Sequence, residues 1–260
     1  MSSPYDREIV ISALHRALPY IRLYRGRIFV VKVGGALCAD SVAQTALVAQ
    51  LAVLCALGIR VVLVHGGGPQ TTELCTKLGI ATELIDGRRV TSAAALEVAV
   101  MTLNGSVSTA LLAACRAADL PAIGVSGVDA GLVRAAQRPP QIREVDGERQ
   151  SVTFGLVGDI VAIDSSVVTR LLDAGLMPIV SPLAADDGGQ VLNINADTVA
   201  ATLACELGAE KLIFLTDTPG LLEDKHNPAS LVSLTDIVGV EARHDGGDID
   251  GGMMPKIKAS

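Results

Sequence analysis

The chain has 260 residues and a formal net charge of −7, and half of its residues are hydrophobic while only 2% are aromatic. The apolar content is therefore mainly aliphatic, which excludes a disordered chain and suits buried strands and closely packed helices. The acidic balance and the scarcity of aromatic rings argue against nucleic acid as a partner. A small phosphate ligand remains compatible, because backbone N–H groups and one or two lysines can bind it.

The five cysteines form no CxxC pair, and we expect small, buried, free thiols in a reducing cytosol. They are Cys38, Cys55, Cys75, Cys115 and Cys205. The N-terminus lacks a basic start followed by an apolar run, so we expect no signal peptide and a cytoplasmic protein. The longest uncharged segment, residues 41–59, contains polar residues and is predicted to be a buried helix rather than a membrane span.

The first elements alternate between helix and strand. Apolar residues at helical spacing predict a helix over 4–24, which Pro19 should kink or interrupt. A strand over 27–33, a helix over 41–57 and a strand over 59–65 follow. Each of these two strands ends in consecutive glycines.

The same alternation continues to the end of the chain, with buried strands predicted over 121–125, 177–180 and 211–215. Aliphatic strands that alternate with helices predict an α/β fold with a mainly parallel, open sheet. Two regions break the pattern. Residues 134–160 are polar and predict a β-hairpin excursion that could act as a lid, and residues 186–189 predict a tight turn.

Two glycine clusters, at 34–35 and 66–68, each follow a predicted strand and precede a predicted helix. In a parallel sheet, both loops lie at the carboxyl edge, where ligands bind. Consecutive glycines let backbone N–H groups approach an anion, and Lys32 stands two residues before the first pair. Neither cluster is a Walker A or GxGxxG motif. Taken singly, each could equally be a tight turn.

Four further polar clusters stand at 88–91, 193–197, 216–221 and 251–256. The second reads Asn-Ile-Asn-Ala-Asp and precedes an apolar helix predicted over 198–207. Alone, each of these clusters is equally compatible with a helix cap or a solvated turn.

Together and in this order, the clusters resemble the motifs of the amino acid kinase family, and within it those of members that phosphorylate N-acetyl-L-glutamate in arginine biosynthesis. The matching segments are KVGG (32–35), HGGGPQ (65–70), RRVT (88–91), NINAD (193–197), TDTPGL (216–221) and GGMMPK (251–256). The resemblance implies an αβα sandwich. It also implies three parts: an N-terminal helix over 1–24, a lobe for the acyl amino acid over 25–207 and a nucleotide-binding lobe over 208–260.

The resemblance implies roles for individual residues. Lys32 and Lys256 would stabilise the transferring phosphoryl group, and Asp197 would orient both lysines. Gly35 and Gly67 would donate N–H bonds near the same group. The acyl amino acid would be held by Gly67, Gly68, Arg89, Asn193 and Asn195, with Arg89 on its α-carboxylate. The nucleotide would be held by Gly34, Asp217, Thr218, Gly220, Leu221, Leu222, Asp248 and Asp250.

The same resemblance implies ATP as the phosphoryl donor and Mg²⁺ held mainly by the nucleotide phosphates, without metal-ligating residues of the protein. A carboxylate nucleophile is already ionised at pH 7, so no general base is expected. The N-terminal helix resembles one that links dimers into a hexamer, so we expect a homodimer or a hexamer that uses this helix. Small molecules are the expected ligands, with neither nucleic acid nor a membrane as a partner.

The chain departs from the family pattern in three places. Gly105 and Val128 stand where a lysine is common, and the chain ends four residues after Lys256, so we expect an incomplete C-terminal lobe. The N-terminal helix would suit arginine feedback, but the effector site that the resemblance implies also uses C-terminal residues that this chain lacks. Two alternatives stay open: a sister kinase acting on another carboxylate or carbamate, and a non-catalytic arginine-sensing domain of the same fold.

Overall fold

The computed structural model describes residues 4–85, 88–145, 148–216, 220–224, 227, 229–236 and 238. Its centre is a five-stranded sheet with the strand order β13-β1-β2-β10-β5, in which every pair of neighbours is parallel. The strands are β1 (Ile28–Val33), β2 (Arg60–His65), β5 (Ala122–Ser126), β10 (Met177–Ser181) and β13 (Lys211–Leu215). The predicted parallel α/β sheet is therefore confirmed.

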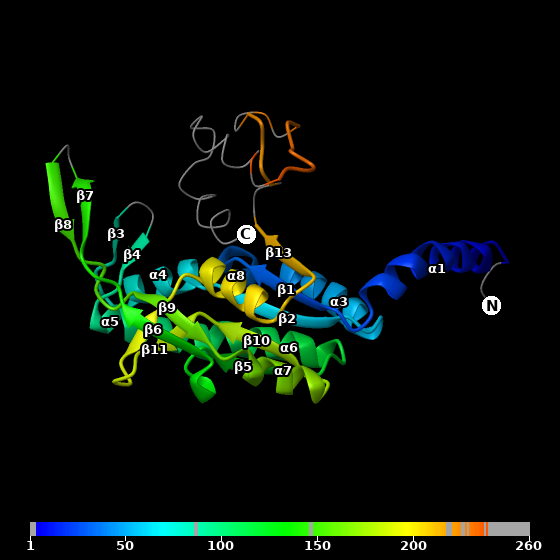
Figure 1. The fold of residues 1–260 in the computed structure, drawn as a ribbon, viewed down its shortest axis with the longest axis horizontal. Coiled ribbons are helices and arrows are strands. Elements are labelled where there is room, and N and C mark those ends of the chain that lie inside the picture. The colour runs from blue at the N-terminus through cyan, green and yellow to red at the C-terminus, as the bar shows by residue number, and fades with distance from the viewer. Residues whose placement is uncertain are drawn as a thin grey trace.

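Helices cover both faces of this sheet (Figure 1). Alternate residues of each strand point to opposite faces, so Val31 and Leu63 pack with α3 and α6, while Val30 and Val62 pack with α7 and α8. The helices are α2 (Gly35–Ala39), α3 (Ser41–Ala56), α4 (Gly68–Lys77), α5 (Ala93–Val100), α6 (Ser108–Ala117), α7 (Ser165–Asp173) and α8 (Ala196–Glu206). The arrangement is the expected αβα sandwich.

A second, smaller sheet has the strand order β12-β11-β6-β9. Its strands are β6 (Val133–Gln137), β9 (Gly158–Ile163), β11 (Leu183–Ala185) and β12 (Val191–Asn193). Strands β7 (Gln141–Val145) and β8 (Glu148–Val152) extend the β6–β9 pair as an antiparallel ribbon, which projects from the body in Figure 1. The predicted excursion at 134–160 is confirmed as nested hairpins. Its role as a lid stays a prediction.

The remaining short elements are the hairpin of β3 (Glu83–Ile85) and β4 (Arg88–Val90), and a 3₁₀ turn over Asp129–Gly131. The predicted turn at 186–189 joins β11 to β12, and the Asp186 carboxylate accepts the N–H groups of Gly188 and Gln190 there, both at 2.9 Å. The division into lobes at residue 207 stays a prediction. β13, just beyond it, extends the same central sheet.

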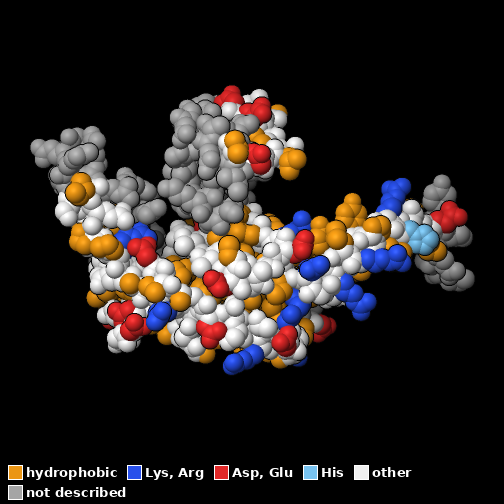
Figure 2. Space-filling view, viewed as in Figure 1, with side chains coloured by type: hydrophobic (Ala, Val, Ile, Leu, Met, Phe, Trp, Pro, Cys, Tyr) orange, Lys and Arg blue, Asp and Glu red, His pale blue; other side chains and the backbone are white. Residues whose placement is uncertain are grey.

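Helix α1 (Pro4–Tyr24) extends away from the sheet (Figure 1), and Figure 2 shows hydrophobic side chains among basic ones along it. It continues through Pro19 without the interruption that the sequence predicted. Apolar residues are exposed over most of its length, including Ile9, Leu14 and Leu23. Nothing else in the described part of the chain covers them.

One continuous helical run was not predicted from the sequence. Helix α5, a π-helix (Met101–Val107) and α6 follow one another without a break over 93–117. This run is long and apolar enough to cross a membrane by length and composition, and 44% of its most apolar window is buried inside the fold. The segment at 41–59, by contrast, contains the shorter helix α3.

The cysteine prediction is largely confirmed, since all five thiols are free and Cys38, Cys75 and Cys115 are buried. Burial raises the pKa of both Cys38 and Cys115 to about 11, so these thiols stay protonated. The prediction was wrong for Cys205, which is exposed near the end of α8.

Candidate functional site

The two glycine loops meet at the carboxyl edge of the central sheet. Val33 and His65, the last residues of β1 and β2, are register partners, and the N–H of Gly66 donates to the carbonyl of Val33 at 2.9 Å. A side chain on Gly35 would place its Cβ 3.1 Å from the Cα of Gly67. The loops therefore touch backbone to backbone, which only glycine allows here.

Helix α4 begins at this contact. Its N-cap is Gly67, and among the described residues no side chain caps it, so the positive end of the helix faces the loop junction. A Cβ on Gly67 would lie 2.7 Å from Cδ2 of Leu103 in the π-helix. The first turn of α4 is thus in close contact with the π-helix. Its N–H groups could bind an anion.

Lys32 and Asp197 form a buried ion pair beside the loops, with 2.7 Å between Nζ and Oδ1. Their side chains are 10% and 8% exposed. Lys32 points to the face of the sheet that α8 covers, and Asp197 stands in the first turn of that helix. Two residues 165 positions apart in the sequence are therefore brought into contact, as the motif match implied.

Asn195 is the N-cap of α8, and its Oδ1 accepts the N–H groups of Asp197 and Thr198 at 2.8 and 3.0 Å. The capping interpretation of this residue is therefore confirmed, and it fixes the position of Asp197. Its expected contact with the substrate stays a prediction.

Asn193, the last residue of β12, is held from two sides. Its Nδ2 donates to Oγ1 of Thr91 at 3.3 Å, and its N–H donates to the carbonyl of Leu156 at 2.9 Å. Thr91 in turn exchanges backbone bonds with Phe154 and Leu156. The base of the hairpin excursion thus builds one wall of the site, which sequence reasoning did not predict.

The structure places the other predicted residues to different extents. Arg89 lies in β4 opposite Leu84, and its side chain is outside the described part. Gly34 is the N-cap of α2, while Gly220, Leu221 and Leu222 follow β13. Leu222 pairs with Leu231 across a short bridge. The following predicted residues lie outside the described residues: Asp217, Thr218, Asp248, Asp250 and Lys256.

Sequence reasoning missed three polar side chains at this edge. His65 is fully buried, and its Nδ1 lies 3.1 Å from the carbonyl of Gly66, to which it donates. Burial lowers the pKa of His65 to about 4. Gln70 donates from Nε2 to the carbonyl of Gly35 at 2.6 Å, and Ser181 donates to Oδ1 of Asn104 at 2.5 Å. The first two stand in the HGGGPQ segment, but nothing in the segment indicates their partners.

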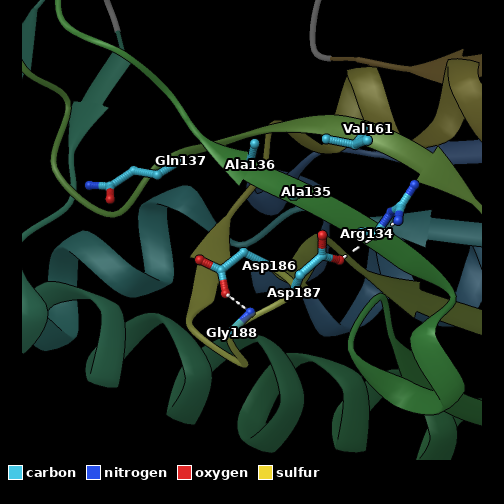
Figure 3. Close-up of a pocket in the computed structure, with 8 residues that line it drawn as sticks. All are labelled: Arg134, Ala135, Ala136, Gln137, Val161, Asp186, Asp187 and Gly188. Carbon is cyan, nitrogen blue, oxygen red and sulfur yellow. Dashed lines mark hydrogen bonds and ion pairs between the residues drawn. The ribbon is translucent and has the colours of Figure 1, made fainter.

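Two pockets lie away from this site. One, of about 270 Å³, lies between β6 and the 186–188 turn. Figure 3 shows Asp186 turned toward Gly188, and Arg134 turned toward Asp187. The nearest nitrogen of Arg134 lies 3.7 Å from Oδ1 of Asp187. The other, of about 660 Å³, lies at the amino-terminal edge of the sheet. Neither contains a motif residue. Among the described residues, no three His, Cys, Asp or Glu side chains gather as a metal site.

The model of the amino acid kinase family matches residues 27–260. The chain belongs to the amino acid kinase family. It is 46% identical to an acetylglutamate kinase of Myxococcus xanthus, over 95% of this chain and 81% of that one. It is 42% identical to the chloroplastic acetylglutamate kinase of Arabidopsis thaliana, over 95% of this chain and 69% of that one.

Two solved structures agree with the fold. An N-acetylglutamate synthase from Neisseria gonorrhoeae superposes with a TM-score of 0.78 and 26% identity. The superposition covers 96% of this chain and 54% of the synthase, so this chain spans about half of that protein. A carbamate kinase from Giardia has a TM-score of 0.64 and 16% identity, which supports the fold alone.

Proposed function

We propose that the chain transfers the γ-phosphoryl group of ATP to the side-chain carboxylate of N-acetyl-L-glutamate, forming N-acetyl-L-glutamyl 5-phosphate in arginine biosynthesis. The observation that carries this proposal is the buried Lys32–Asp197 ion pair beside two touching glycine loops at the carboxyl edge of the sheet. The similarity to acetylglutamate kinases supports the choice of acid.

The chemistry follows from these residues. One oxygen of the substrate carboxylate attacks the γ-phosphorus, and the bond between that phosphorus and the ADP oxygen breaks. The carboxylate is ionised at pH 7, so the protein has no proton to remove. Lys32 and the N–H groups of Gly35 and Gly67 neutralise charge on the equatorial oxygens, and Asp197 fixes the direction of the lysine. Lys256 would act from the other side.

The remaining roles are part of the same proposal. Gly67, Gly68, Arg89 and Asn193 would hold the acid, and the fork of Arg89 suits both oxygens of its α-carboxylate. The nucleotide would lie against Gly34 and the segment after β13, over residues 217–222, and against Asp248 and Asp250. Mg²⁺ supplied with ATP would be held mainly by the nucleotide phosphates and would neutralise their oxygens.

The test is a trapping assay. Purified protein with ATP, Mg²⁺ and hydroxylamine should yield an acyl hydroxamate when N-acetyl-L-glutamate is present, because hydroxylamine attacks the acyl phosphate. Carbamate phosphorylation, followed through ADP release, and reactions with L-glutamate or L-aspartate serve as comparisons. Turnover with one of these acids alone would replace the proposed substrate. Tight arginine binding without any turnover would replace catalysis by a sensing role.

We also propose a homodimer, or a hexamer that uses α1, in the cytosol. The exposed apolar residues along α1 support self-association, and the free thiols suit a reducing compartment. Light scattering that gives a monomeric mass would contradict the assembly.

A further inference from the structure

Gln70 is a side chain of α4 that the mechanism above does not use. It stands three residues after the N-cap Gly67, where a glutamine can turn back to the backbone of its own cap. Here the side chain turns away from its own helix instead. Its Nε2 donates at 2.6 Å to the carbonyl of Gly35, which belongs to the other glycine loop and lies 35 residues earlier in the chain.

The contact between Gln70 and Gly35 is closely packed. A Cβ on Gly35 would lie 2.8 Å from Cδ of Pro69 and 2.9 Å from Oε1 of Gln70. The missing side chain of Gly35 therefore makes room for the first turn of α4. The orientation of the amide is fixed, because a carbonyl oxygen can only accept and the reversed amide would present oxygen to oxygen.

The orientation of the amide has a cost. Oε1 of Gln70 is buried and has no hydrogen-bond partner among the described residues. A buried acceptor without a partner is unfavourable, and an apolar side chain of the same length would fill the same space without that penalty. Packing among the described residues therefore does not account for a glutamine here, and the bond from Nε2 to Gly35 is the one interaction that distinguishes it from an apolar side chain.

The two N–H groups assigned to the phosphoryl group come from different loops, at Gly35 and Gly67. Donors that stabilise a transition state must be held in place before the reaction, since reorganisation would consume their effect. Among the described residues, two hydrogen bonds join these loops: the N–H of Gly66 donates to Val33, and the side chain of Gln70 donates to Gly35. The second of them holds Gly35, one of the two residues assigned as donors.

We propose that Gln70 is a positioning residue of the phosphoryl-transfer site, whose amide ties the loop after β1 to the first turn of α4. It thereby fixes the separation of the Gly35 and Gly67 N–H groups. The kinetic part of this inference rests on the proposed function, whereas the structural part does not.

The test uses Gln70→Met, which keeps the length of the side chain and its contact with Gly35 but removes the donor. The matched control is Gln137→Met, because Gln137 also donates from Nε2 to a glycine carbonyl, that of Gly155 at 2.8 Å, from an exposed position on β6. We expect Gln70→Met to lower kcat by about ten- to a hundredfold, with each KM changed by less than about threefold. Gln137→Met should leave kcat and each KM within about twofold of the wild-type values.

Amide hydrogen exchange of the unliganded protein is the second readout. Peptides that cover 33–36 and 65–70 should exchange about tenfold faster in Gln70→Met, and peptides elsewhere should not. Thermal unfolding checks that each variant is folded, and Gln70→Ala replaces Gln70→Met if the latter is not.

Three results would overturn the inference: an unchanged kcat, a loss that falls entirely on KM, or a reduced kcat with unchanged exchange, which would make Gln70 a substrate contact. A wild-type protein without turnover on any acid would refute the proposed function alone. The exchange experiment would still decide whether Gln70 ties the loops.

Discussion

His65 provides a prediction about pH, because it is an ionisable side chain in a fully buried position at the end of β2. Its Nδ1 donates to the carbonyl of Gly66, and its Nε2 has no hydrogen-bond partner among the described residues. A proton on Nε2 would place an uncompensated charge in the core, and burial accordingly lowers the pKa of His65 to about 4.

The magnitude follows from linkage. The ordinary pKa of 6.5 applies to His65 in the unfolded chain. Between pH 6.5 and about 4, the imidazole is therefore protonated in the unfolded state and stays neutral in the folded state. The free energy of unfolding therefore falls as the pH falls through this window. At about 1.4 kcal/mol per pH unit, His65 alone accounts for a loss of about 2 kcal/mol at pH 5 and about 3 kcal/mol at pH 4.

The assay is urea unfolding followed by circular dichroism at pH 7.5, 6.5, 5.5 and 5.0. The wild type is compared with His65→Asn, whose amide can still donate to Gly66 but does not titrate. His15→Asn, on the exposed surface of α1, is the matched control. Hydrogen bonds with Lys77 and Ser166 lower the pKa of Glu73 and Asp164, so both titrate in acid, equally in all three proteins.

We expect the loss between pH 7.5 and 5.0 to be about 2 kcal/mol smaller in His65→Asn than in the wild type. His15→Asn should follow the wild type. Equal slopes in all three proteins would show that His65 titrates normally in the folded state. The buried, neutral imidazole described above would then be wrong.

Two further predictions concern the loops and the ion pair. Gly67→Ala brings a methyl group to 2.7 Å from Leu103 and should lower the free energy of unfolding by about 1–3 kcal/mol. Gly68→Ala is the control, because its methyl group meets nothing within 4 Å. Equal melting temperatures for the two variants would contradict this prediction. Lys32→Met should lower kcat by orders of magnitude with a smaller change in KM, and adding Asp197→Asn should recover stability but not kcat. A near-normal kcat in Lys32→Met would remove Lys32 from its role.

The strands of the central sheet could be predicted because a strand that is buried on both faces appears in the sequence as a short apolar run. Four of the six residues in each of β1 and β2 are aliphatic, and glycines, which weaken a strand, follow directly after each. The predicted strand bounds agree with the structure to within one residue. The short helix α2 was missed, since the five residues after Gly34 have no periodicity long enough to detect.

The site could be predicted only where a single short segment of the sequence forms a recognisable motif. Glycine loops and the NINAD segment are local patterns, and the structure brings them together as parallel topology requires. The bonds that hold them are long-range: Gln70 to Gly35, and Asn193 to Thr91. A glutamine or threonine in a sequence has no preferred partner, because the fold alone decides which carbonyl or hydroxyl it meets.

The π-helix at Met101–Val107 shows the same limit within one element. Its sequence reads Met-Thr-Leu-Asn-Gly-Ser-Val, and although Asn, Gly and Ser are poor helix formers, they do not by themselves predict a wider turn. Two of its residues make contacts outside the helix: Leu103 occupies the space beside Gly67, and Asn104 accepts a hydrogen bond from Ser181 of β10. A wider turn at this point lets one helix pack on the sheet and reach the loop junction, as such turns often do at functional sites.

The acidic composition now has a physical explanation. Lys32 is paired with Asp197, so this part of the site has almost no net charge before a ligand arrives. The attraction for an anion must then come from a few groups with fixed positions, namely the amino-terminal end of α4 and the N–H groups of the two loops. Such groups act over a few ångströms and do not depend on the charge of the whole chain. An acidic protein can therefore bind anionic ligands, provided that its loops are held in place, and Gln70 holds the loop after β1 against the first turn of α4.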